Sequence, residues 1–416
     1  MEVSYSLRFK KSSLLKSSVI DKEGEIIIYE KGFRIKGKGA NDNGELLSFS
    51  EIKEFYHRDD KIYFVTFLKE KYVLLDAGTQ INQIILDLYK SRNSFLIDAL
   101  FMKKGSLKFE FDADFSRTSK SGKLINYGEC KLKFYEKSLV VFPKLQDAFA
   151  VHYDFIKSHN FNDFDYTFEI ITDDDLKITF SKLGNDFELL EEKVNTILGM
   201  LYADLVNNVF RKIFPSYTSS DLLKLAYKIK NGKTASIKEI KKINDELIDD
   251  LKVFFTEDES YLDKINYLSS VCNTDEVRYG FTKDSINSEN YTKWCLFPIP
   301  SKNLVAICVL PRWEDTDSKS NLDFLFFKII MEKGDPETKI IDKINEITQA
   351  LVVLDFIYEP CYIEKKKLKH SPFQYATRKL PFLRILRKSF CGIASNSELP
   401  LFKEEVGKIM SSSEIL

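Results

Sequence analysis

The chain of 416 residues has little of what several classes of function require. It contains four histidines and six cysteines, and no two cysteines form a CxxC pair, which disfavours a closed zinc site. With 16 glycines and 10 prolines, it is neither collagenous nor dominated by linkers. Its formal net charge of −1 argues against a generally polybasic protein of the histone type.

Long apolar runs are also missing. A typical run, 304–310, is far below the roughly 18 residues that a membrane-spanning helix needs. The N-terminal stretch has basic residues but lacks the apolar core of a secretory signal peptide. The scattered cysteines fit a reducing compartment. We therefore expect a soluble, cytoplasmic protein, and its length predicts about two to four domains.

The sequence contains a repeat with a period of 104 to 106 residues. Five landmarks recur in the same order: Gly24-Glu25 and Gly128-Glu129; 29–31 and 135–137; 49–52 and 153–156; Gly78 and Gly184; and the apolar sets Ile81, Ile84, Leu88 and Phe187, Leu190, Val194. In each copy, strands in which aromatic and other residues alternate precede the later glycine, Gly78 or Gly184. The spacing of the apolar residues after that glycine predicts a helix. We infer a duplicated domain of several strands and one terminal helix. Two unrelated β-rich stretches of similar composition are the alternative.

This order of strands, glycine and helix resembles a pleckstrin-homology-like (PH-like) domain. The tandem copies are similar to those in the middle domain of the histone chaperone FACT and in bacterial PH-like tandems. The resemblance implies an α+β protein with two partly open β-barrels, each capped by a C-terminal helix, at 20–104 and 123–214. It also implies a platform for proteins, peptides or phosphoinositides and no enzymatic activity. Residues 1–19 are expected to form an N-terminal extension.

The remaining chain changes character twice. Residues 216–271 predict a helical spacer, in which Ser236 and Glu239 form a capping box at the start of a helix over 236–251. That helix resembles a helix-turn-helix recognition helix, but its acidic C-terminal half would repel phosphates. Residues 275–360 predict an α+β domain that is either a third, diverged PH-like unit or an unrelated fold. Its strands are expected near 277–281, 292–299, 303–310 and 322–331. A helix is then expected to open at Gly334-Asp335-Pro336 and to carry its apolar face over 340–354.

The C-terminal segment, 361–416, carries a local positive charge. Nine basic and no acidic residues lie between 365 and 388, interleaved with aromatic and aliphatic residues. Such a field suits anionic lipid head groups or nucleic acid. A solvated surface that pairs with acidic residues elsewhere is the alternative. The candidate contacts with an anionic partner are Lys365, Lys366, Lys367, Arg378, Lys379, Arg384, Arg387 and Lys388.

Motifs for catalysis do not come together in this sequence. His57-Arg58-Asp59 spells a kinase tripeptide, but the glycine-rich loop and the metal-binding motif are missing, so we interpret it as a turn. We expect no cofactor, no metal and no enzymatic activity. The favoured hypothesis is a cytoplasmic adaptor or scaffold whose tandem PH-like domains bind protein partners. The alternative is a peripheral binder of anionic lipid or nucleic acid through 365–388, and a cryptic enzyme is the third hypothesis. The oligomeric state stays open.

Overall fold

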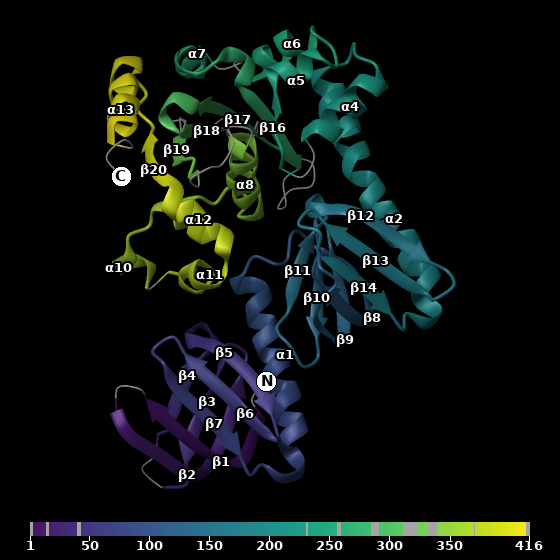
Figure 1. Ribbon diagram of the computed structural model, residues 1–416, viewed down its shortest axis with the longest axis vertical. Helices are drawn as coiled ribbons and strands as arrows, with labels where there is room; N and C mark the ends of the chain where they lie inside the picture. The colour runs from purple at the N-terminus through teal and green to yellow at the C-terminus, as the bar shows by residue number, and fades with distance from the viewer. Residues whose placement is uncertain are drawn as a thin grey trace. The chain divides into compact units, whose positions relative to one another are not determined.

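The computed structural model describes residues 3–13, 16–39, 43–229, 232–255, 259–283, 291–310, 323–331, 339–369 and 371–412. The protein is α+β and is built from curled antiparallel sheets and helices (Figure 1). It divides into two compact units. The first unit comprises Met1–Glu191 and Ser371–Lys379, and the second comprises Glu192–His370 and Leu380–Leu416.

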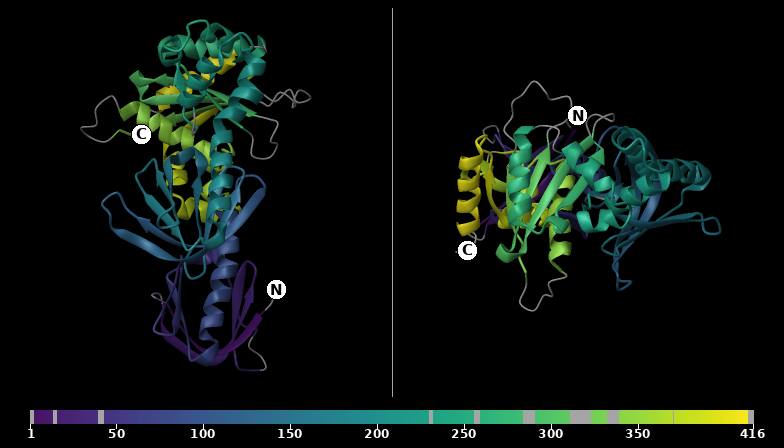
Figure 2. Two further views of the ribbon diagram at one scale, coloured as in Figure 1. Left: turned by 90° about the vertical axis from the view of Figure 1, so that its right-hand side faces the viewer. Right: turned by 90° about the horizontal axis from the view of Figure 1, so that it is seen from above.

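The first sheet has seven strands in the order β4-β3-β2-β1-β7-β6-β5. Their bounds are β1 Val3–Ser13, β2 Lys16–Tyr29, β3 Gly32–Gly37, β4 Glu45–Ser48, β5 Ile52–Arg58, β6 Lys61–Thr66 and β7 Glu70–Leu75. The helix α1 (Ile81–Ala99) follows, and its Ile84 and Leu88 are fully buried in one core with Phe33 and Phe64 of the sheet. Figure 2 (left view) shows the sheet curving around this helix.

The second sheet repeats this arrangement in the order β11-β10-β9-β8-β14-β13-β12. Its strands are β8 Leu107–Thr118, β9 Leu124–Tyr135, β10 Ser138–Pro143, β11 Phe149–His152, β12 Ile156–Asn162, β13 Thr167–Thr172 and β14 Lys177–Ser181. The register shifts after Ile52 and after Ile156, at equivalent positions. The helix α2 (Phe187–Asp204) follows and continues through a π-helical turn, Leu205–Phe210, into α3 (Arg211–Ile213). The repeat inferred from the sequence is therefore present as one strand order used twice; we call the two arrangements copy 1 and copy 2.

The repeated glycines occupy positions that need them. Gly78 and Gly184 have φ values of +58° and +57° at the step from the last strand to the helix, in the left-handed region that favours glycine. Gly24 lies where β2 and β3 approach closely, because a Cβ atom there would lie 2.1 Å from the carbonyl oxygen of Lys36. These constraints explain why the glycines stand out as landmarks.

The predicted starts of both copies were wrong. Residues 1–19 are not an extension, because β1 pairs with β2 and β7 in the middle of the first sheet. Copy 2 likewise begins before residue 123, since β8 pairs with β9 and β14. Both strands are held by pairing with the last strand of their copy, which lies about sixty residues further along the chain. Local sequence patterns do not encode such long-range pairing.

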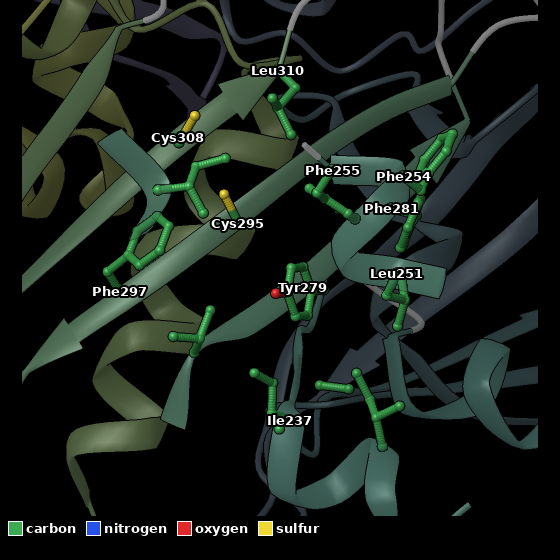
Figure 3. Close-up of a cluster of buried hydrophobic side chains, with 14 of the residues drawn as sticks. Ile237, Leu251, Phe254, Phe255, Tyr279, Phe281, Cys295, Phe297, Cys308 and Leu310 are labelled. Atoms are coloured by element: carbon green, nitrogen blue, oxygen red, sulfur yellow. The ribbon is translucent and has the colours of Figure 1, made fainter. Parts of the chain in front are cut away.

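The second unit combines a third sheet with helices around one apolar core. The sheet contains β15 Ala235–Ser236, β16 Arg278–Lys283, β17 Tyr291–Ile299, β18 Leu304–Leu310, β19 Phe324–Lys328 and β20 Phe390–Ala394, in chain order. Its helices are α4 Ser219–Ile229, α5 Ile237–Lys241, α6 Leu247–Phe255, α7 Glu259–Val271, α8 Lys339–Val353, α9 Glu359–Tyr362, α10 Lys365–Leu368, α12 Pro381–Ser389 and α13 Leu399–Ser412. Figure 3 shows Phe254 and Phe255 of α6 beside Tyr279 and Phe281 of β16.

The structure bears on three further predictions in this unit. The capping box of Ser236 and Glu239 is confirmed, but the helix over 236–251 breaks after Lys241 and resumes at Leu247. The described strands over 275–360 lie in the sheet in chain order, so they do not repeat the strand order of copies 1 and 2. The expected helix start at Gly334-Asp335-Pro336 lies outside the described residues. The regions 216–271, 275–360 and 361–416 are also not separate, since one core joins them and β20 pairs with β19.

Candidate protein-interaction site

A short stretch of the C-terminal segment, 371–379, is part of the first unit, although its flanks on both sides belong to the second. It contains the helix α11 (Gln374–Lys379) of six residues. A helix this short is not stable alone in water, so its structure depends on the surface beneath it. That surface, which we call the joint, lies where α1 and copy 2 meet and is formed by Phe67, Arg92, Phe95, Leu96, Met102, Val140, Asp147 and Ala148.

Tyr375 anchors the segment in the joint. Only 2% of this residue is exposed to solvent. Its ring packs edge-on against Phe95 and Phe67, at centroid distances of 5.1 and 6.2 Å. Its hydroxyl group lies 3.5 Å from Nη2 of Arg92. Tyrosine suits such a position because its ring buries a large apolar area and its hydroxyl reaches a polar partner.

Arg92 is the buried charge of the joint. Its side chain is 1% exposed, and its Nε and Nη2 atoms donate to the two carboxylate oxygens of Asp147 at 2.6 and 2.9 Å. Burial disfavours the charged guanidinium, but the hydrogen bonds and the charge of Asp147 outweigh this effect and raise the pKa of Arg92. Its Nη1 atom is buried without a hydrogen-bond partner. The joint thus holds an arginine with two of its five N–H groups unpaired.

Asn93 ties α1 to copy 2 beside this ion pair. Its amide nitrogen donates to the carbonyl oxygens of Pro143 and Gln146, both at 2.9 Å, and its oxygen accepts from the backbone of Ala148 at 2.8 Å. The side chain is fully buried, so these bonds replace those it would make with water. The positions equivalent to Arg92 and Asn93 in copy 2 are Leu198 and Gly199. The joint is therefore a feature of copy 1 alone.

Two of the predicted contact residues for an anionic partner lie in this segment. The guanidinium of Arg378 lies 4.5 Å from the ring centroid of Phe67. The Nζ atom of Lys379 donates to the carbonyl oxygen of Lys53, and burial lowers the pKa of this lysine. Both side chains thus contact copy 1.

The other six lie in the second unit. Arg387 donates to the carbonyl oxygens of Pro360 and Ile363, at the end of α9, the latter at 2.8 Å. Five are exposed on α10 and α12: Lys365, Lys366, Lys367, Arg384 and Lys388. The structure therefore distributes the eight residues over two units.

Other candidate groups fall outside any assembled site. His57 and Arg58 end β5, and Asp59 begins a turn with φ of +50°, as expected for a hairpin. Within the described ranges, no three His, Cys, Asp or Glu side chains lie together as a metal site would need. Burial raises the pKa of the Cys130 thiol to about 12 and that of Cys272 to about 11. No helix in the described part of the chain is both long and apolar enough to cross a membrane.

The residues of the joint were missed at the sequence level, although one signal was present. Arg92 stands four residues after Leu88 and four before Leu96, on the buried face of α1. A charged residue in an apolar helix stripe indicates a buried pair or an interface. Its partners Asp147 and Tyr375 are 55 and 283 residues away, so no local pattern connects them.

Comparisons with known proteins do not identify a family for this chain. No protein-family model matches the chain. No curated protein matches it either. Among solved structures, one chain from the "Structure of the Spt16D Pob3N heterodimer" matches with 13% sequence identity and a TM-score of 0.17, covering 41% of this chain and 83% of that chain. At this TM-score the likeness carries no argument.

Proposed function

We propose that this protein is a non-enzymatic, cytoplasmic adaptor whose tandem PH-like copies bind protein partners, and that the joint is its peptide-binding site. The observation that carries the proposal is the burial of Tyr375, which is 2% exposed in a nine-residue segment whose flanks belong to the other unit. The first unit thus binds part of its own chain as it would bind a peptide. A protein partner would use the same surface.

The bound segment defines the chemistry of such a partner. Tyr375, Arg378 and Lys379 stand at positions i, i+3 and i+4, which one helical turn places on neighbouring sites. The aromatic ring fills the joint, and the two basic side chains contact Phe67 and the backbone of Lys53. This is recognition of a short helix by a groove. We expect partners with a buried aromatic residue followed at three and four positions by basic residues.

The state of the thiols supports an adaptor over an enzyme with a nucleophilic cysteine. Five of the six cysteines are buried, all six are free, and burial raises the pKa of Cys130 and Cys361 to about 12. Such thiols stay protonated at neutral pH and are poor nucleophiles. Free thiols also fit a reducing compartment.

A labelled peptide that spans residues 368–382 tests this proposal on the full-length chain. Wild-type protein should bind it weakly, because the tethered segment competes at an effective concentration in the millimolar range. The variant Y375A should vacate the joint and bind the peptide more tightly, as measured by fluorescence anisotropy. A peptide with Tyr375→Ala is the matched control and should not bind. Equal binding by wild type and Y375A would contradict the proposal.

A second candidate function rests on the exposed lysines of α10. Lys365, Lys366 and Lys367 are exposed, as expected for contacts with an anionic surface. Charge reversal of all three, K365E/K366E/K367E, should then remove co-sedimentation with phosphatidylserine vesicles or duplex DNA at low salt. If the wild-type protein sediments with neither at low ionic strength, this function is excluded.

A further inference from the structure

Copy 2 carries an exposed aromatic surface that copy 1 lacks. We call it the aromatic tip, and it consists of Phe164, Tyr166 and Leu189 with the carboxylates of Asp163, Asp165, Asp186 and Glu188. Phe164 is 96% exposed, Tyr166 is 58% exposed and Leu189 is 45% exposed. Exposure of this much aromatic surface at one place is typical of a contact site.

The tip is ordered by local contacts. The backbone amide of Phe164 donates to the side-chain oxygen of Asn162 at 3.0 Å, which closes the turn between β12 and β13. The ring of Tyr166 packs edge-on against Phe187 at the start of α2, with centroids 5.4 Å apart. This contact brings the hairpin turn beside Asp186, Glu188 and Leu189.

Copy 1 joins its equivalent strands, β5 and β6, by a shorter turn that contains no aromatic residue. Its turn is Asp59-Asp60, and the positions equivalent to Asp186, Glu188 and Leu189 are Gln80, Asn82 and Gln83. The fold therefore requires neither an exposed phenylalanine in this turn nor negative charge at the start of the following helix. Among the described residues, none of the four carboxylates of the tip forms an ion pair. The tip thus combines exposed apolar side chains with carboxylates that form no ion pair among the described residues.

The second unit displays a surface of opposite charge and similar design. On α12, Arg384, Ile385 and Lys388 point to solvent on one face, which we call the basic face. Ile385 is 43% exposed and lies beside the two cations. Neither cation forms an ion pair with any residue that the structure describes. A surface of exposed apolar and basic side chains is complementary to a surface of exposed apolar and acidic side chains.

We propose that the protein self-associates head to tail, with the aromatic tip of one copy of the chain binding the basic face of α12 in a second copy. The contact joins two different surfaces, so it leaves one tip and one basic face unused in each pair and permits open-ended assembly. Both surfaces are small, and the contact is therefore weak and favoured at low salt and high protein concentration. It involves neither Tyr375 nor the joint, so it stands independently of the proposed function.

Analytical ultracentrifugation of the full-length protein tests this assembly. The average mass should rise above 48.4 kDa as the concentration increases at low salt and return to 48.4 kDa at high salt. The variants F164S and R384E/K388E should each stay at 48.4 kDa, since each lacks one of the two surfaces. The matched control L68S removes another exposed apolar side chain, 73% exposed, from the first unit and should assemble like the wild type.

A mixture of the two variants that cannot self-associate provides the most direct test. F164S retains the basic face and R384E/K388E retains the aromatic tip, so an equimolar mixture should form a complex of twice 48.4 kDa and stop there. The proposal is overturned if wild-type protein stays monomeric at every concentration at low salt. It is equally overturned if L68S prevents assembly or if the mixture does not form the pair.

Discussion

Removal of the counter-charge of Arg92 should loosen the joint. In Asp147→Asn the side chain keeps its size but loses its charge, so the guanidinium, which is 1% exposed, stays buried without a counter-ion. Loss of one partner of a fully buried pair costs about 3–5 kcal/mol, whereas exposed pairs contribute below about 1 kcal/mol. Since Asp147 is 45% exposed, we expect an intermediate cost of about 1–3 kcal/mol for this variant.

The assay must report on the joint itself. A global unfolding curve mixes contributions from the two units, and a single free energy is then poorly defined. Hydrogen exchange measured by mass spectrometry resolves local opening. In D147N, peptides from the end of α1 and from 371–379 should exchange faster, since Arg92 contacts Tyr375 as well as Asp147. Peptides from the third sheet should be unchanged.

A neighbouring ion pair supplies the matched control. Glu129 pairs with Lys144, and both side chains are more than half exposed, at 61% and 59%. Glu129→Gln should leave the stability almost unchanged, because the pair is exposed and screened by water, and should leave exchange in 371–379 unchanged. Equal exchange in D147N, E129Q and the wild type would refute the reasoning, because it would mean that the buried charge does not hold the joint together.

Three further predictions follow from burial. Ile84→Ala and Leu190→Ala remove equivalent, fully buried side chains from the two copies and should each cost about 2–5 kcal/mol in urea unfolding; a cost below about 1 kcal/mol at either site would contradict equivalent cores. Burial raises the pKa of Tyr375, so docking of its segment should be complete below about pH 10 and be lost as the pH rises further, and Y375F should lack this dependence in hydrogen exchange. A thiol reagent should modify half-buried Cys391 before fully buried Cys130, and the reverse order in peptide mass spectra would contradict the described burial.

The repeat was predictable because its landmarks obey local rules. Gly78 and Gly184 are needed for a left-handed backbone, and Ile84 and Leu190 recur at the spacing of a helix face. The first strands, β1 and β8, were missed although they also alternate between apolar and polar residues. In β1, only Leu7 and Phe9 are buried, and the rest of its side chains are polar or partly exposed. From Val3 to Phe9 its apolar and polar residues alternate, as in a half-buried strand, but its pairing with the distant β7 cannot be read from this alternation.

The sequence shows where the charged residues stand, but not what their side chains contact in the folded protein. Residues 365–388 are rich in basic residues, as the sequence shows. However, Arg387 donates hydrogen bonds to backbone carbonyl oxygens, and Lys379 contacts copy 1. The joint depends on Arg92, whose partners are separated from it by 55 and 283 residues. A single sequence carries no record of such pairings, because each requires the assembled fold.

Differences between the two copies are more informative than their similarity. Where the copies agree, as at Gly78 and Gly184, the fold alone accounts for the residue. Where the two copies have different residues at equivalent positions, the shared fold accepts both residues. The fold therefore does not explain why either residue is there. Two such positions hold Arg92 in copy 1 with Leu198 in copy 2, and Gln83 in copy 1 with Leu189 in copy 2. Arg92 lies in the joint, and Leu189 is exposed in the aromatic tip. Duplication thus supplies an internal control that separates residues needed for folding from residues available for binding.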